Sequence, residues 1–129
     1  MTVKISWYDE EKTIILQEFP VEWTWDEFYE IVRQSVEMEK SVPHTVYSIG
    51  TNPPNAKTPP GNALNNFRSA LLMHPPNMRW YIIATGNLLT RILGLTILRA
   101  GIFGEKLRVV GSLEDALRIV AQDKERQHA

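Results

Sequence analysis

Cysteine is absent from this sequence of 129 residues. Its absence excludes disulfide bonds, catalysis by a thiol and metal sites built on thiolates. It also agrees with a reducing compartment, and we predict that the protein is cytoplasmic. An excess of charge of one sign is lacking as well, because 14 basic and 15 acidic residues give a formal net charge of −1. We therefore expect no nucleic-acid partner, since such partners are attracted by a strongly basic surface.

Long uninterrupted apolar runs are also missing, although a helix that crosses a membrane requires about 20 apolar residues. The longest apolar segment, residues 88–103, is broken by two arginines and two glycines, Arg91, Gly94, Arg99 and Gly101. Residues 1–7 lack the basic segment and the apolar core of a signal peptide. We predict neither a membrane span nor a secretion signal.

Sequence motifs for catalysis and cofactor binding are not found. The glycines form no dinucleotide-binding motif, and residues 101–104 lack the lysine and the hydroxyl of a phosphate-binding loop. The histidines do not have the spacing of metal ligands; they are His44, His74 and His128. His74 is expected near the end of a helix, where a positive charge interacts favourably with the helix dipole. We predict no catalytic, cofactor or metal-binding residue, and a protein that is not an enzyme.

The acidic pair Asp26 and Glu27 has two interpretations. Two neighbouring carboxylates can act as a general acid and a general base. However, Thr24 followed three residues later by Glu27 is a capping box, which satisfies free N–H groups at the start of a helix. We favour the structural interpretation for both acids.

The hydrophobic pattern predicts five strands and four helices in the order β-β-α-β-α-β-α-β-α. The strands are expected at residues 3–8, 12–19, 44–50, 79–85 and 106–110. The helices are expected from residue 24 to about 40, and at 62–74, 88–100 and 113–123. Strands that alternate with helices pair in parallel, and the opening hairpin adds an antiparallel edge. We predict one α/β domain over residues 1–129, with an open, mixed, mostly parallel five-stranded sheet and a frayed tail at about 124–129.

The strand at 79–85 is the most strongly predicted element. It is continuously apolar and bounded by turns, which is typical of a central strand with both faces covered. Trp80 is therefore expected in the core. Trp25, at a helix start beside polar residues, is expected either in the core or at a binding surface.

A proline-rich loop follows the strand at 44–50. Four of the eight prolines lie between residues 51 and 61, so this loop is predicted to be stiff and extended. In α/β domains, ligands and partners meet the protein where a strand ends and the next helix begins. The candidate binding residues are those with polar or small side chains at this junction: Thr51, Asn52, Thr58, Gly61 and Asn62. The helix start at 61–63 is also a plausible anion site.

The helix predicted at 88–100 carries more apolar residues than one buried face requires. They wrap over half of its circumference, and Arg91 and Arg99 interrupt them only partly. One explanation is an exposed patch that a partner or a second subunit buries, with Leu95 and Leu98 as contacts. The alternative is that neighbouring elements cover these residues within one chain.

The chain resembles the STAS family, which has the anti-sigma-factor-antagonist-like fold. The resemblance covers nearly the whole chain and rests on the element order, the helix start Trp-Thr-Trp-Asp-Glu-Phe at 23–28, the strand-loop-helix at 44–67 and the turn into the final helix at 109–116. Many STAS proteins carry Asp-Ser-Ser-Gly or Asp-Ser-Thr-Gly after the third strand, where a kinase phosphorylates the hydroxyl. This chain instead has Thr-Pro-Pro-Gly-Asn at 58–62, so only Thr58 or Thr51 can be the phosphoacceptor.

The resemblance implies a small, non-enzymatic, cytoplasmic module of the bacterial regulatory type, which binds a protein partner such as a regulator or kinase of the anti-sigma system. Two hypotheses follow. The first is an interaction module that docks a partner, or a second copy, through the proline-rich loop and the apolar helix. The alternative is a carrier of a small hydrophobic, lipid-like ligand in a pocket between the helices and the sheet. We predict that the loop is a docking surface and not a phosphorylation switch.

Overall fold

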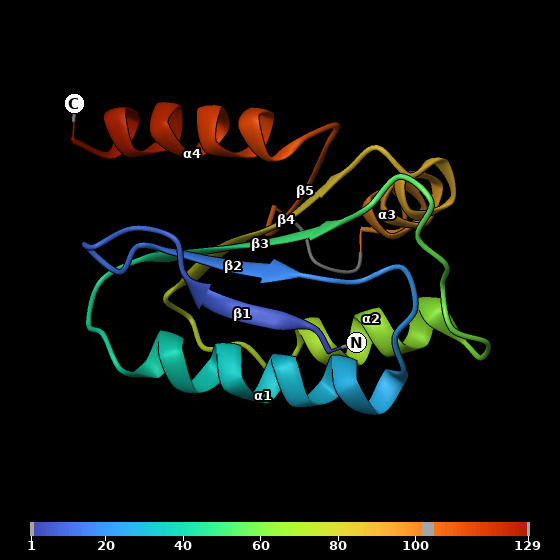
Figure 1. Ribbon diagram of the computed structural model, residues 1–129. Coiled ribbons are helices and arrows are strands. Elements are labelled where there is room, and N and C mark those ends of the chain that lie inside the picture. The colour runs from blue at the N-terminus through green and yellow to red at the C-terminus, as the bar shows by residue number, and fades with distance from the viewer. Residues whose placement is uncertain (1, 102–104, 129) are drawn as a thin grey trace.

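The computed structural model describes residues 2–101 and 105–128 and shows an α/β fold (Figure 1). The strands are β1 (Lys4–Trp7), β2 (Ile14–Glu18), β3 (Val46–Asn52), β4 (Met78–Thr85) and β5 (Leu107–Val110). The helices are α1 (Trp25–Lys40), α2 (Ala63–Leu71), α3 (Leu88–Arg99) and α4 (Leu113–His128). The predicted order of elements is therefore confirmed.

The five strands form one sheet in the order β1-β2-β3-β4-β5. The first pair, β1 and β2, is antiparallel, and every other pair is parallel. Asp9 closes the turn between the first two strands, because its carboxylate Oδ1 accepts from the backbone N–H groups of Thr13 and Ile14 at 2.9 Å each. The open, mixed and mostly parallel sheet that the sequence predicts is confirmed.

The helices cover the two faces of the sheet unequally. Figure 1 shows α4 above the sheet and α1 and α2 below it. Side chains of β2, β3 and β4 that point to the α4 face form one buried cluster with Ala116 and Val120 of α4. Side chains on the other face of β4 and β5 pack with Leu71 of α2 and Ile97 of α3. The strand β4 is thus covered on both faces, as its apolar sequence predicts, and Trp80 is buried.

The helix α1 begins and packs as its sequence predicts. Thr24 Oγ1 accepts from the backbone N–H of Glu27 at 3.1 Å, and the Glu27 side chain accepts from the Thr24 backbone, which completes the capping box. The buried face consists of residues that recur three or four positions apart, as one face of a helix does: Phe28, Ile31, Val32, Ser35, Val36 and Glu39. Two of these six are polar, so this helix brings hydrogen-bonding groups into the interior.

Several element boundaries differ from the sequence prediction. The strand β3 continues to Asn52, because Asn52 pairs with Thr85 in the parallel ladder. The helix α2 ends at Leu71 and not near residue 74, so His74 lies beyond the helix. The helix α4 continues past Asp123 to His128. Residues 124–127 are Lys, Glu, Arg and Gln, all of which favour helix.

The helix α4 is attached to the sheet through the buried Asp123. Its Oδ2 accepts from the Tyr47 hydroxyl at 2.6 Å, and its Oδ1 accepts from Arg79 Nη2 at 2.9 Å. Hydrogen bonding to the Arg79 guanidinium, together with that to Tyr47, lowers the pKa of Asp123 against the opposing effect of its burial. Burial and the Asp123 carboxylate raise the pKa of Tyr47, so its hydroxyl stays protonated as the donor.

We expect this attachment to weaken in acid. A carboxylate whose pKa is lower in the folded than in the unfolded state stabilises the fold fully above the unfolded pKa of about 3.9. This contribution is lost as the pH falls through the folded pKa. Urea unfolding of the wild type and of Asp123→Asn should therefore differ by roughly 1–3 kcal/mol at pH 7 and should converge towards pH 3. A difference that stays constant from pH 7 to pH 3 would contradict the role of the Asp123 charge.

Candidate functional site

A small pocket lies at the carboxyl ends of the parallel strands, on the face that carries α2 and α3. Its volume is about 40 Å³. The apolar walls are Phe19, Trp23, Phe67, Ile83 and Leu93. The polar groups around them are Thr51, Asn52, Lys57, Thr58 and Thr90. Apolar walls with a few convergent polar groups are typical of binding sites in proteins.

A chain of polar side chains connects the strand ends beside this pocket. Thr85 Oγ1 donates to Asn52 Oδ1 at 2.5 Å, and Asn52 Nδ2 donates to Thr90 Oγ1 at 3.0 Å. Asn87 forms the cap of α3, because its Oδ1 accepts from the backbone N–H of Thr90 at 2.9 Å. The ends of β3 and β4 and the start of α3 are therefore held in one arrangement at the pocket.

The loop at 53–62, which we call the docking loop, is held to the fold at several points. Asn87 Nδ2 donates to the carbonyl oxygens of Pro54 at 2.8 Å and of Ala56 at 3.0 Å. The Lys57 backbone N–H donates to the carbonyl oxygen of Val21 at 2.8 Å. Trp25 Nε1 donates to the carbonyl oxygen of Pro60 at 3.0 Å. The loop has no regular secondary structure, and these bonds to its backbone fix its path.

Aromatic side chains form the wall of the pocket towards α1. Trp23 packs against Phe19 and Trp25, with ring centroids 5.1 Å apart in each pair. Trp25 also packs edge-on against Phe67 of α2 at 5.8 Å. Trp25 is half-buried, and it joins the aromatic cluster to the docking loop. Of the two roles that its sequence position suggests, packing is the one that the structure shows.

The floor of the pocket is a close contact between Gly50 and Tyr81. The Tyr81 hydroxyl donates to Gln17 Oε1 at 2.7 Å, and Gln17 Nε2 donates to Ser35 Oγ at 2.7 Å. A Cβ atom at position 50 would lie 2.5 Å from the Tyr81 hydroxyl oxygen, so only glycine leaves space for it. Burial, together with the nearby Glu39 carboxylate, raises the pKa of Tyr81. The hydroxyl is therefore a fixed donor within the interior.

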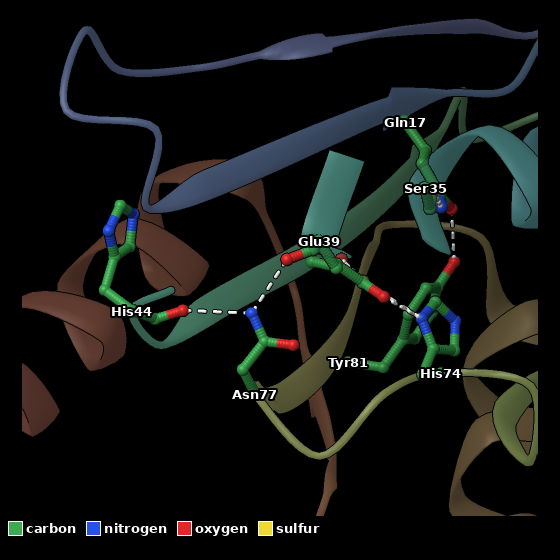
Figure 2. Close-up of polar contacts among 8 residues, drawn as sticks. Gln17, Ser35, Glu39, His44, His74, Asn77 and Tyr81 are labelled. Carbon is green, nitrogen blue, oxygen red and sulfur yellow. Dashed lines mark hydrogen bonds and ion pairs between the residues drawn. The ribbon is translucent and has the colours of Figure 1, made fainter. Parts of the chain in front are cut away.

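A second polar group lies beside this floor, between α1 and the sheet. Figure 2 shows the Glu39 carboxylate pointing towards the His74 ring. His74 Nδ1 lies 2.7 Å from Glu39 Oε1, and Ser48 Oγ donates to Glu39 Oε2 at 3.0 Å. The Glu39 side chain is 0% exposed and that of His74 is 2% exposed. Neither residue lines the pocket, so we assign this pair to the stability of the fold.

The interpretation of His74 as a charge at a helix end is wrong. The helix α2 ends three residues earlier, and the ring contacts the Glu39 side chain of a different helix. Asn77 fixes the connection that carries His74, because its Nδ2 donates to the carbonyl oxygens of Glu39 at 2.8 Å and His44 at 3.0 Å (Figure 2).

The structure brings three of the predicted binding residues together and separates two others. Thr51, Asn52 and Thr58 all line the pocket, whereas Gly61 and Asn62 lie at the start of α2 and do not line it. Asn62 Oδ1 accepts from the backbone N–H of Asn65 at 3.0 Å. One donor of the suggested anion site is therefore already bonded within the helix start.

The helix α3 exposes apolar side chains, but Leu95 and Leu98, the two predicted contacts, are not the most exposed of them. Leu95 is half-buried and Leu98 is 36% exposed. The most exposed side chains lie nearer the start of the helix: Leu88 at 69%, Leu89 at 70% and Ile92 at 51%. The end of α3 that borders the pocket thus carries the larger apolar surface.

Within residues 2–101 and 105–128, no three His, Asp or Glu side chains are grouped so that they could hold a metal ion. In the same ranges, no helix has the length and apolar character that are needed to cross a membrane.

Two sets of long-range hydrogen bonds near the pocket have no signal in the sequence. Asn87 immediately precedes the helix predicted at 88–100, and Asn before an apolar helix is a capping signal. Its bonds to a loop more than 30 residues away have no sequence signal. The same holds for the pairs Gln17–Tyr81 and Glu39–His74, whose partners are 64 and 35 residues apart.

Comparison of this chain with models of protein families, with curated proteins and with solved structures found no match. The resemblance to the STAS family therefore stays a prediction.

Proposed function

We propose that this protein is a non-enzymatic interaction module that docks a protein partner on the docking loop. The partner inserts one anchor side chain into the pocket that Thr51, Asn52 and Thr58 line. The partner expected from the STAS resemblance is a regulator or kinase, or a second copy of the chain.

The observation that carries this proposal is the fixed backbone of an exposed loop. Thr58 and Pro60 are exposed, yet the carbonyl oxygens of Pro54, Ala56 and Pro60 are bonded to side chains of other elements. Ordering a flexible loop on binding costs free energy, and a loop that is already fixed avoids this cost. A rigid surface beside an aromatic-walled pocket supports partner docking.

The size of the pocket favours a docked side chain over a lipid-like ligand. Sites that enclose small molecules have volumes of roughly 300–1,000 Å³. This pocket, at about 40 Å³, has space for a side-chain group and not for an acyl chain. The carrier hypothesis would require α2 and α3 to move apart, so we place it second.

The exposed apolar end of α3 supplies a second contact surface. Thr90 and Leu93 of α3 line the pocket, and Leu89 and Ile92 on the same helix are exposed. Apolar residues beside a pocket with polar groups at its edge are typical of interfaces. A partner anchored in the pocket would cover these residues.

The proposal can be tested without knowledge of the partner. Peptides selected from a random phage-displayed library against the wild-type protein should bind at the docking loop. In hydrogen exchange, a bound synthetic peptide should protect residues 51–62. Thr58→Arg places a bulky side chain at the pocket entrance, and it should weaken peptide binding about tenfold or more, as expected for the centre of an interface.

Thr45→Arg is the matched control, because it makes the same substitution at an exposed threonine next to the amino end of β3. It should leave peptide affinity unchanged. Leu89→Gln should weaken binding less than Thr58→Arg, since Leu89 lies outside the pocket. Selected peptides that bind Thr58→Arg as tightly as the wild type would refute the docking site.

A further inference from the structure

A second and larger hollow lies at the opposite ends of the strands. It is a groove of about 500 Å³ along the amino ends of β3, β4 and β5, and Gln127 near the end of α4 also lines it. Its volume is within the range of sites that bind small molecules, roughly 300–1,000 Å³. The pocket beside the docking loop shares no lining residue with it.

Positive side chains dominate the lining of this groove. Arg79, Lys106 and Arg108 carry positive charge, and Glu105 is the one acidic side chain among the described lining residues. Arg79 is already paired with Asp123. Among the described residues, Lys106 and Arg108 form no ion pair with a carboxylate, so their charges are available to a ligand.

Packing holds the Arg108 guanidinium in place. Its carbon Cζ lies 4.3 Å from the centroid of the Trp80 ring, a favourable cation–π distance. Its Nη1 donates to the carbonyl oxygens of Glu105 at 2.5 Å and of Leu107 at 3.0 Å. An arginine fixed in this way retains further N–H donors, and their planar arrangement matches the oxygens of a phosphate.

We propose that this groove binds a small molecule that carries a phosphomonoester, with the phosphate held by Lys106 and Arg108. A phosphomonoester carries a charge of about −1.5 to −2 at pH 7 and three acceptor oxygens. A phosphomonoester therefore matches the charges of Lys106 and Arg108 better than a carboxylate, which carries a single negative charge. Glu105 opposes the ligand charge and limits the affinity.

The probes for the test are adenosine monophosphate, glucose 6-phosphate and inorganic phosphate. Each is titrated into the ¹⁵N-labelled wild-type protein at low ionic strength. The amide signals of residues 105–108 and of Trp80 should shift with at least one phosphomonoester, and added salt should weaken binding. Binding of both organic phosphates assigns the site to the phosphate group, and binding of one shows that the rest of that molecule contributes.

Charge variants test the assignment. Lys106→Gln and Arg108→Gln should each weaken binding about tenfold or more, as expected when a hydrogen bond to a charged group is lost. Glu105→Gln should tighten binding. Lys4→Gln, which removes one exposed positive charge at the other end of the sheet, is the matched control and should leave affinity unchanged. Arg108→Lys keeps a positive charge beside Trp80 but removes the guanidinium group. A loss of affinity in this variant is therefore attributable to the guanidinium donors.

The proposal is overturned if neither adenosine monophosphate nor glucose 6-phosphate shifts the amide signals of residues 105–108, whether or not inorganic phosphate does. It is equally overturned if adenosine or glucose binds as tightly as its phosphorylated form, or if Lys106→Gln weakens binding no more than Lys4→Gln does.

Discussion

Replacing Ile82 with aspartate should abolish the cooperative unfolding transition of this protein. Ile82 is 0% exposed and belongs to the cluster that β2, β3 and β4 form under α4. An aspartate at this position would carry a buried charge with no partner, at a cost of several kcal/mol. The total stability of a domain is only about 5–15 kcal/mol. We expect the variant to show no sigmoidal melt by circular dichroism.

Ile82→Val is the control for this experiment. It removes one methylene group, keeps the β-branched shape and should cost only about 0.5–1.5 kcal/mol. Cooperative melting of Ile82→Asp near the wild-type temperature would show that Ile82 of β4 is not buried between the sheet and α4.

Replacing His74 with alanine should lower the free energy of unfolding by about 3–5 kcal/mol. The reason is that Glu39, 0% exposed, would lose its ring partner and would keep, among the described residues, the Ser48 hydroxyl as its one side-chain hydrogen-bond partner. Removal of one partner from a buried hydrogen-bonded pair leaves the other polar group without its partner, which is strongly destabilising. Urea unfolding at pH 7 measures the loss.

The double variant Glu39→Gln/His74→Ala separates the charge from the lost volume of the ring. A neutral amide at position 39 has no uncompensated charge, so the double variant should be more stable than His74→Ala alone. The single variant Glu39→Gln completes the comparison. If the loss of stability in the double variant equals the sum of the losses in Glu39→Gln and His74→Ala, Glu39 and His74 are not coupled.

Local signals predicted most of the fold. The Thr24–Glu27 capping box and the 3.6-residue spacing of α1 each depend on residues within one or two turns, and the structure shows both. The continuous apolar run at 79–85 likewise predicted a strand covered on both faces, and β4 is that strand. Such signals are readable because the interactions that they report lie close together in the sequence.

The candidate site was predictable only in outline. The end of a strand before a proline-rich loop pointed to Thr51, Asn52 and Thr58, which share the pocket. The pocket floor was not predictable, because the contact of Tyr81 with Gly50 and Gln17 depends on the register of three strands. The spacing of α1 placed Glu39 on the buried face, but it did not reveal which side chain would meet it.

The strand order has a consequence for how the chain folds as it is synthesised. Each strand pairs with the strand before it in the sequence, so every strand can join an edge that already exists. Three of the four pairings are parallel, however, and parallel pairing is slow because the segment between the two strands must be closed into a loop first. Among the described residues, α4 is the one helix that covers the apolar face with Tyr47, Ile49 and Ile82, and α4 follows all five strands. Until residues 113–128 leave the ribosome, that face is open to other chains, and this is the interval in which the nascent protein most needs a chaperone.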